Sequence, residues 1–503
     1  MADLSSLFAG FELALSWHNI LFMGIGVLLG IVVGVLPGLG GPNGVAILLP
    51  LTFGMNPTSA IILLSSIYWG ALFGGAITSI LFNIPGESWS VATTFDGYPM
   101  AVQGRAGEAL TAAFTASFFG ALSGVILITF VAPLVAQFAL RFGPAEFFAV
   151  FLLTFCSFVG MGKEHRAKIV AALCLGFLLA ACGVDTVSGD IRLTFGVTAL
   201  MHGFDFLVVV IGLFGVGEIL LTVEEGLQFK GKRADIDLKV VLRTWAGLPR
   251  YWGTLVRSAI VGMWMGVTPG GAVAASFMGY GLAKRFSKRG HNFGKGEIEG
   301  VLGPETAAHA AGTSALLPML ALGIPGSATA AVLLGGLLIW GLQPGPLLFV
   351  EHKEFVWGLI ASMYLGNIAG LIIVLATVPL FAAIMRVPFT LVAPIILIIC
   401  AIGAYTISNS IFDVWLMLAF GVVGYVFKKL DYPMAPLVLA LVLGDRTEEA
   451  ARQALIGSEG DLNVFFANGL VTSLILLAFA LLLWGPISDL VARLRRKAVP
   501  QMG

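Results

Sequence analysis

Two pairs of glycine–proline breaks are the residues of this sequence best suited to binding a small anion. Residues 34–38 (Gly-Val-Leu-Pro-Gly) match residues 266–270 (Gly-Val-Thr-Pro-Gly), and residues 83–86 (Asn-Ile-Pro-Gly) match residues 323–326 (Gly-Ile-Pro-Gly). A break in a helix frees backbone N–H groups at the start of the next half-helix, where partial positive charge collects. Such helix starts bind carboxylates without a formal cation. The pattern therefore indicates a carboxylate site.

Small residues at and beside the breaks would complete this site. Glycine lets a ligand approach the backbone closely, and short polar side chains supply directional hydrogen bonds. The alternative is that these residues only allow tight packing between helices. The residues that we expect to bind the substrate are Pro37, Gly38, Asn43, Asn83, Gly86, Ser88, Gly270, Gly326, Ser327 and Thr329.

A carboxylate and an imidazole form a second candidate group. Glu305 opens a stretch of 45 uncharged residues, and His309 follows four positions later. On a helix the two side chains share a face. At the edge of a cavity they would carry a coupling ion, either a proton or Na⁺. The alternative is that Glu305, directly after Pro304, only complements a helix N-terminus.

Few other polar residues are candidates for a functional site. We expect Asp96, ahead of Gly97 and Pro99, to form a loop. The four cysteines lie in apolar stretches without a CxxC pair, so we expect neither a disulfide framework nor a metal site. Beyond the coupling ion we expect no cofactor.

The elements that carry these residues must be membrane helices. The chain of 503 residues is 58% hydrophobic and only 11% charged, against about a quarter in ordinary soluble proteins. This composition excludes a disordered chain, a nucleic-acid binder and a conventional soluble enzyme. A crossing helix needs about 20 apolar residues. Windows at least that long without Asp, Glu, Lys or Arg are 13–86, 109–140, 258–283, 306–350, 355–385, 387–412 and 462–488.

We therefore predict an all-α polytopic membrane protein with about 11–13 transmembrane helices. Basic clusters at 163–168, 230–239, 284–289, 428–429 and 493–497 are expected to face the cytoplasm. The segment 253–283 has basic clusters at both ends and is too short for two crossings, so we expect a re-entrant hairpin. The first basic residue is Arg105, which argues against a cleaved signal peptide.

The parallel order of the breaks indicates a duplicated, transporter-like core. We predict a first half at 1–222, a polar cytoplasmic connector at 223–250 and a second half at 251–503, each half with broken, re-entrant helices. Paired interruptions in two halves are the best sequence pointer to a transporter's binding site.

Several motifs resemble one family, the large membrane subunit of the tripartite tricarboxylate transporters (TctA family). The motifs are residues 37–40 (Pro-Gly-Leu-Gly), 68–75 (beginning Tyr-Trp-Gly), 83–86, 96–101 (Asp-Gly-Tyr-Pro-Met-Ala) and 323–327. One departure is Ala308-His309, where the family usually has two asparagines.

The resemblance implies a multi-pass permease of the bacterial inner membrane that imports a tricarboxylate or related organic acid by ion-driven symport. It implies two protein partners, a small integral-membrane subunit and a periplasmic solute-binding protein, besides the carboxylate substrate and membrane lipid. It implies neither an enzyme nor a nucleic-acid partner.

Other function classes find less support in the sequence. An ATP-driven pump would need a P-loop, and no GxxxxGK[ST] run occurs. An intramembrane enzyme has no HExxH or GxSxG motif to support it. A channel does not need two sets of broken helices. The runner-up is a self-sufficient secondary carrier for small organic anions that works without a binding protein.

Overall fold

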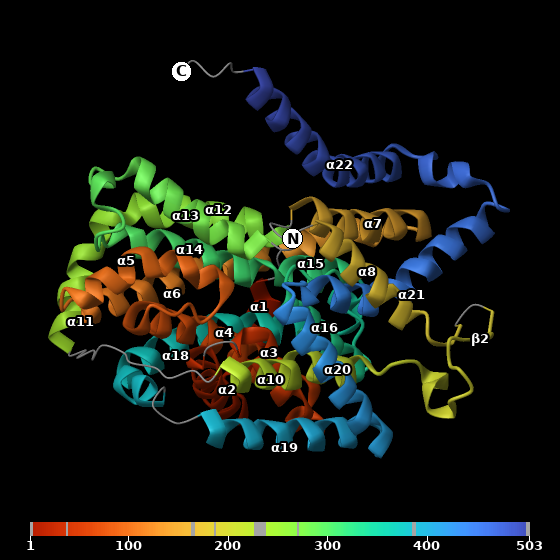
Figure 1. Ribbon diagram of the computed structural model, residues 1–503, viewed down its shortest axis with the longest axis horizontal. Helices are drawn as coiled ribbons and strands as arrows, with labels where there is room; N and C mark the ends of the chain where they lie inside the picture. The colour runs from red at the N-terminus through yellow and green to blue at the C-terminus, as the bar shows by residue number, and fades with distance from the viewer. Residues whose placement is uncertain are drawn as a thin grey trace. The chain divides into compact units, whose positions relative to one another are not determined.

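The computed structural model describes residues 4–36, 39–161, 166–185, 188–225, 238–268, 271–384 and 389–498. Almost all of these residues are helical (Figure 1). The strands among them are β1 (Gly183–Val184) and β2 (Ile191–Arg192), which pair antiparallel with Gly183 opposite Arg192. The predicted all-α polytopic class is confirmed.

Six helices of the described part are long and apolar enough to cross a membrane. They lie at residues 17–35, 57–82, 106–139, 206–224, 353–380 and 411–429. Four shorter apolar helices occur at residues 144–160, 328–339, 393–408 and 469–483. The chain is thus a multi-pass membrane protein, while the total of 11–13 crossings stays a prediction.

The chain divides into two compact units, residues 1–140 with 206–429 and residues 141–205 with 430–503. The predicted halves at 1–222 and 251–503 stay a prediction, and part of the connector between them, 226–237, lies outside the described residues.

The first unit holds both sets of breaks. Its helices are α1 (Leu4–Ala14), α2 (Trp17–Val35), α3 (Gly40–Leu48), η1 (Leu49–Thr52), α4 (Pro57–Phe82), η2 (Ser88–Ser90), α5 (Val91–Val102), α6 (Ala106–Ala139), α9 (Phe206–Val210), η4 (Ile211–Val216), α10 (Gly217–Glu225), α11 (Leu238–Gly247), η5 (Leu248–Tyr251), α12 (Trp252–Val267), α13 (Gly271–Phe286), η6 (Gly290–Asn292), α14 (Glu299–Ser314), α15 (Leu316–Leu322), α16 (Ala328–Ile339), α17 (Leu348–Glu351), α18 (Lys353–Ile384), α19 (Phe389–Ser408) and α20 (Ile411–Lys429).

The centre of this unit is α4, whose residues 60–81 are all buried. Small residues let α2 lie directly against it. A methyl group added to Gly70 would lie 2.9 Å from the Cα atom of Gly30, and one added to Gly74 would lie 2.8 Å from the Cα atom of Gly34. Such small-residue faces let two membrane helices approach backbone to backbone. The contact fixes the break that follows α2 beside α4.

The second set of breaks lies on the other helices of the same unit. The expected hairpin at 253–283 is the pair α12 and α13, and both helices pack against α14. Each has 16 residues, about 24 Å of helix against a hydrocarbon core of about 30 Å. These lengths suit a hairpin that enters the membrane without crossing it.

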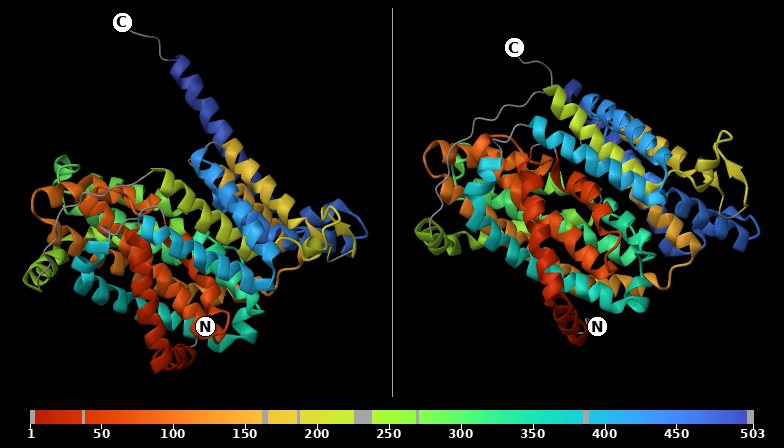
Figure 2. Two further views of the ribbon diagram at one scale, coloured as in Figure 1. Left: turned by 60° about the horizontal axis from the view of Figure 1, so that its bottom comes forward. Right: turned by 90° about the horizontal axis from the view of Figure 1, so that it is seen from below.

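The second unit is a smaller group of helices. Its elements are α7 (Pro144–Met161), α8 (Arg166–Ala180), β1, β2, η3 (Thr198–His202), α21 (Met434–Gly457), η7 (Leu462–Phe466) and α22 (Gly469–Ala498). Helix α21 packs against α7 and α8, as Figure 2 shows from two sides. The Asp185 carboxylate pairs with Arg192 and with Arg452, each at 3.0 Å, and so ties the β-hairpin to α21.

Candidate functional site

The second and fourth breaks have the same backbone geometry. Helix α4 is followed by Asn83 with φ of 60°, and α15 is followed by Gly323 with φ of 74°. The next amide then bonds back in the same way, from Ile84 N to Thr78 O at 3.3 Å and from Ile324 N to Pro318 O at 3.1 Å. In both turns a left-handed residue is thus followed by an amide that bonds to the carbonyl six positions earlier. The two sequence matches are therefore equivalent turns.

The glycines of these turns are needed for close packing. A methyl group on Gly86 would lie 2.6 Å from the Cα atom of Gly75, and one on Gly326 would lie 3.0 Å from the Cα atom of Ala315. Gly75 and Ala315 lie the same number of positions before Gly86 and Gly326, so they are equivalent positions ahead of the two matched breaks. Both breaks thus fold back onto the helix that precedes them.

The half-helix α3, after the first break, begins against a carboxylate of the protein itself. Gly40 has φ of 53°, and the amide of Gly41 donates a hydrogen bond to Glu87 Oε1. Glu87 follows the second break and is half-buried. Its own amide donates to Ser90 Oγ at 3.0 Å, which fixes the start of η2. A carboxylate at a helix start meets the partial positive charge there.

Residues from α4, α14 and α16 are linked around this helix start. A methyl group on Gly41 would lie 3.2 Å from the ring of Tyr68 on α4 and 3.3 Å from Thr329 Oγ1 on α16. The Tyr68 hydroxyl donates to the carbonyl of Gly312 on α14 at 3.0 Å and also has a side-chain hydrogen bond with Ser327. The group around Gly41 thus joins residues near the first, second and fourth breaks.

Ser327 and Thr329 are the predicted site residues that this group includes. Ser327 Oγ accepts from the amide of Ala330 at 3.1 Å and so caps α16, and Thr329 is buried. Asn43 is buried on α3, whereas Asn83 is exposed at the end of α4. Predicted site residues outside the described part are Pro37, Gly38 and Gly270, together with the side chain of Ser88.

Glu87 is the residue of this group that the sequence reasoning missed. The available signal was its place as the first charged residue after 74 uncharged ones, directly behind a break. The third break also reaches this region, because Ser276 Oγ on α13 donates to the carbonyl of Trp89 at 2.6 Å.

The second candidate group, Glu305 and His309, lies inside α14. Both side chains are buried, at 3% and 1% exposure. Glu305 accepts hydrogen bonds from Thr93 at 2.6 Å and from Ser117 at 2.9 Å, and His309 Nδ1 lies 3.5 Å from Glu305 Oε2. Helix α14 begins at Glu299, so Glu305 does not cap its N-terminus. The alternative reading of Glu305 as a helix-start residue is wrong.

This group joins three helices around one buried carboxylate. Thr93 comes from α5, Ser117 from α6, and the His309 ring packs 5.6 Å from the ring of Phe73 on α4. An ionisable pair at such a depth is costly, and in membrane proteins it usually serves a function. Among the described residues, no cluster of three His, Cys, Asp or Glu side chains could hold a metal ion.

Comparison of the sequence with known protein families identifies the family of this chain. A sequence model of the tripartite tricarboxylate transporter TctA family matches residues 20–439. The chain belongs to this TctA family.

Two similar proteins come from Agrobacterium vitis. The chain is 39% identical over 485 residues to the "uncharacterized 52.8 kDa protein in TAR-I ttuC' 3'region", and the match spans 95% of this chain and 96% of that protein. It is 40% identical over 215 residues to the "uncharacterized protein in TAR-II ttuC' 3'region", which covers 42% of this chain and 89% of that protein. No solved structure matches the chain.

In this TctA-family chain Asp96 is not in a loop, and that expectation is wrong. Asp96 lies within α5 and is fully buried. Its carboxylate accepts from the amides of Gly294, Gly296 and Glu297 at 2.8–3.0 Å and from the Tyr280 hydroxyl at 2.9 Å. The Asp-Gly-Tyr-Pro motif thus anchors the loop between α13 and α14.

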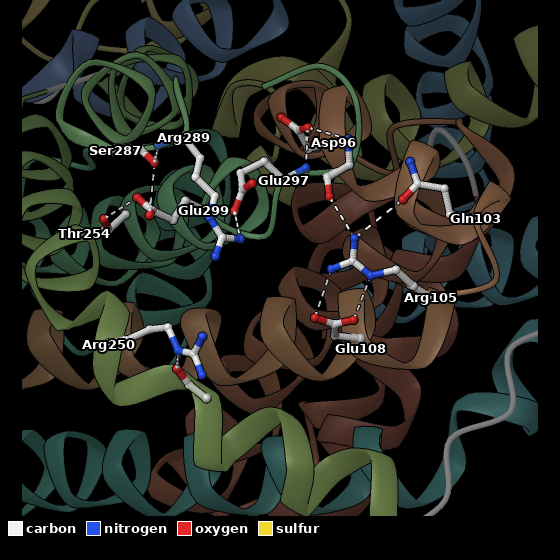
Figure 3. A network of polar contacts seen from close by, with 12 residues as sticks. Asp96, Gln103, Arg105, Glu108, Arg250, Thr254, Ser287, Arg289, Glu297 and Glu299 are labelled. Atoms are coloured by element: carbon white, nitrogen blue, oxygen red, sulfur yellow. Dashed lines mark hydrogen bonds and ion pairs between the residues drawn. The ribbon is translucent and has the colours of Figure 1, made fainter. Parts of the chain in front are cut away.

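Charged residues beside this anchor form a network at the ends of the helices (Figure 3). Arg105 donates to Glu108 at 2.9 and 3.0 Å and to the carbonyl of Gly296 at 3.1 Å. The hydrogen bonds that Arg105 donates to Glu108 raise the pKa of Arg105. Burial raises the pKa of Glu297, although Arg289, 3.8 Å away, opposes this shift. The network holds the start of α6 against the loop before α14.

Proposed function

We propose that this protein is the permease subunit of a tripartite transport system that imports a carboxylate across the bacterial inner membrane. Membership of the TctA family supports the transport role. The observation that carries the site proposal is the meeting of Gly41, Glu87, Tyr68, Ser327 and Thr329 at the start of α3.

The start of α3 would act as a carboxylate subsite. Its amide already holds a carboxylate, that of Glu87, which supports the chemistry proposed for this position. The nearby hydroxyl groups of Tyr68, Ser327 and Thr329 would add hydrogen bonds whose direction selects the shape of the anion. No formal cation is needed, because the helix start provides the positive potential.

The pair Glu305 and His309 would couple transport to an ion gradient. Its helix α14 also provides Gly312, which accepts the hydrogen bond of Tyr68. The substrate group and the ion group are therefore joined through one helix and the Tyr68 side chain. The coupling ion would be H⁺ or Na⁺, and the transport mode symport.

The partners would be a small integral-membrane subunit and a periplasmic solute-binding protein that delivers the carboxylate. The tripartite character of the family supports this proposal. The self-sufficient carrier remains the second candidate, since the site of this chain has the polar groups to bind an anion by itself.

Uptake of radiolabelled citrate by membrane vesicles tests both candidates. Vesicles carrying the chain with its two partner subunits should accumulate citrate under an imposed Na⁺ or pH gradient. The gradient that drives uptake identifies the coupling ion. Omission of the binding protein should abolish uptake. Equal uptake without it would favour the self-sufficient carrier. If no member of a panel of di- and tricarboxylates is accumulated, the carboxylate function itself is wrong.

A further inference from the structure

A polar pocket lies apart from the proposed transport site, where α11 meets the start of α6. It has a volume of about 640 Å³. Its walls include the charged residues Arg105, Glu108, Arg243 and Arg250, together with Thr244 and Tyr251. Arg105 directly precedes α6, and the other side chains come from α6, α11 and η5, all in the first unit.

The pocket has more positive charge than its own carboxylate can neutralise. Arg105 forms an ion pair with Glu108 through two hydrogen bonds. Arg250 donates its Nε hydrogen to the carbonyl of Gly247 at 3.0 Å, a bond to a neutral group (Figure 3). No ion pair of Arg243 or Arg250 is present among the described residues. Two guanidinium groups therefore face this pocket without an anionic partner from the described part of the chain.

The position of the pocket favours a membrane ligand. Helix α6 is a candidate membrane span that begins at Ala106, directly after Arg105. The pocket therefore lies beside the start of this candidate span, and the ends of membrane-crossing helices meet the lipid headgroups. Basic side chains next to a span attract anionic lipids.

Helix α11 adds an apolar surface beside this charge. Leu238, Leu242 and Trp245 are exposed and lie at positions i, i+4 and i+7, so they share one face of the helix. Val241, Thr244 and Leu248 point inward and are buried. A helix with an exposed apolar face and adjoining arginines is typical of segments that lie in the plane of the membrane interface. The indole of Trp245 donates to Thr115 of α6 at 2.9 Å and fixes α11 beside the span.

We propose that this pocket binds the phosphate group of an anionic phospholipid, with Arg243 and Arg250 as its ligands. The planar guanidinium groups would pair with the phosphate oxygens. The acyl chains would lie along the exposed face formed by Leu238, Leu242 and Trp245. The lipid would thereby hold α11, and with it the end of the connector, against the membrane.

Lipid retention by the purified chain tests the proposal. The wild type and the double variant Arg243→Gln/Arg250→Gln would be compared by native mass spectrometry after exposure to phosphatidylglycerol or phosphatidylcholine. A matched control is Lys288→Gln, which removes an exposed cation outside the pocket. The wild type and the control should retain phosphatidylglycerol, whereas the double variant should lose on the order of tenfold or more of this retention.

Two further arms identify the source of the phosphate. Thermal melting would be measured with added phosphatidylglycerol, inorganic phosphate or glycerol phosphate. Stabilisation by the lipid alone supports the proposal. Equal stabilisation by the soluble phosphates would overturn it in favour of a soluble anion, and equal retention of both lipids would overturn it in favour of non-specific lipid contact.

The folded state of the variant has its own check. The double variant should melt at the wild-type temperature in phosphatidylcholine. If it does not fold, Arg243→Lys/Arg250→Lys keeps the charge but loses the paired geometry, and an intermediate loss of lipid is then expected. Unchanged retention in either folded variant would show that another surface binds the lipid, for example one that the small subunit normally covers.

Discussion

Glu305 and Glu87 are two carboxylates of the same unit with different surroundings. Glu305 is buried between two hydroxyl donors and an imidazole, whereas Glu87 is half-buried and bonded to the amide of Gly41. The first environment suits a group that carries an ion, and the second suits a group that shares a position with a ligand anion. This difference leads to two separate predictions.

Replacement of Glu305 by Gln should abolish coupled uptake while leaving the protein in the membrane. The amide can still bond to Thr93 and Ser117, but it can carry neither a proton nor a charge. We expect gradient-driven uptake to fall to the level seen without an imposed gradient, because the variant lacks the ionisable group and not the hydrogen bonds. Citrate uptake in vesicles measures it, with the exposed Glu351→Gln as control. Normal uptake and normal ion dependence in the Glu305 variant would assign coupling to another group.

Replacement of Glu87 by Gln should strengthen citrate binding. The Gln carbonyl can still accept from Gly41, so the break should stay folded, but the like charge is gone. Two unit charges 4 Å apart repel by about 4 kcal/mol at a protein-like dielectric, so an affinity gain of at least about tenfold is reasonable. Isothermal titration of the purified chain with citrate measures it. Weaker binding by a folded variant would mean that Glu87 helps to hold the ligand.

Sequence spacing predicted one of these carboxylates and missed the other. Glu305 and His309 are four residues apart, and helical periodicity alone brings them together. Glu87 owes its role to Gly41, which lies 46 positions away and meets it only after α2 and α4 have packed. The burial of Asp96 was missed for the same reason, since its donors lie about 200 positions later.

The breaks are turns that place polar groups near the proposed site and also pack tightly against neighbouring backbone. The match between residues 83–86 and 323–326 predicted two similar interruptions. In the structure both have a residue with left-handed backbone angles at the same position, and the next amide bonds to the carbonyl six positions earlier. The sequence could not tell that Gly86 and Gly326 also pack on the preceding helix. A large substitution there would therefore disturb folding before it could report on ligand access.

The break glycines should be more sensitive to substitution than a glycine in open space. Gly86→Ala brings a methyl group to 2.6 Å from Gly75 and 2.9 Å from the carbonyl of Gly34, whereas Gly326→Ala meets Ala315 at 2.9–3.1 Å. We expect Gly86→Ala to destabilise by about 1–3 kcal/mol and Gly326→Ala by less. The control is Gly24→Ala, where no atom lies within 4 Å. Melting temperatures in detergent measure the stability of the three variants. Equal melting temperatures of Gly86→Ala and Gly24→Ala would contradict the tight packing around Gly86.

Across the whole molecule, composition and charge spacing predicted more than motifs did. The uncharged windows specify membrane helices because each buried backbone polar group must be satisfied within its own helix. The pattern of basic residues predicts which ends face the cytoplasm, although it leaves the region before Arg105 without a signal. Sidedness is therefore the property of the whole chain most worth measuring.

Cysteine labelling should place Lys239 and Lys288 on the cytoplasmic side and Phe195 on the other. Lys239 and Lys288 lie beside basic clusters, whereas Phe195, 87% exposed, lies between the clusters at 163–168 and 230–239 in a loop with Asp185 and Asp190. Single-Cys variants at these positions would be made after replacing the native Cys156, Cys174, Cys182 and Cys400. A membrane-impermeant maleimide should label the Phe195 variant in intact cells and the two lysine variants only in inverted vesicles. Labelling of the Lys288 variant in intact cells would show that α12 and α13 do not return to the side from which they enter, and would remove the re-entrant hairpin from the fold.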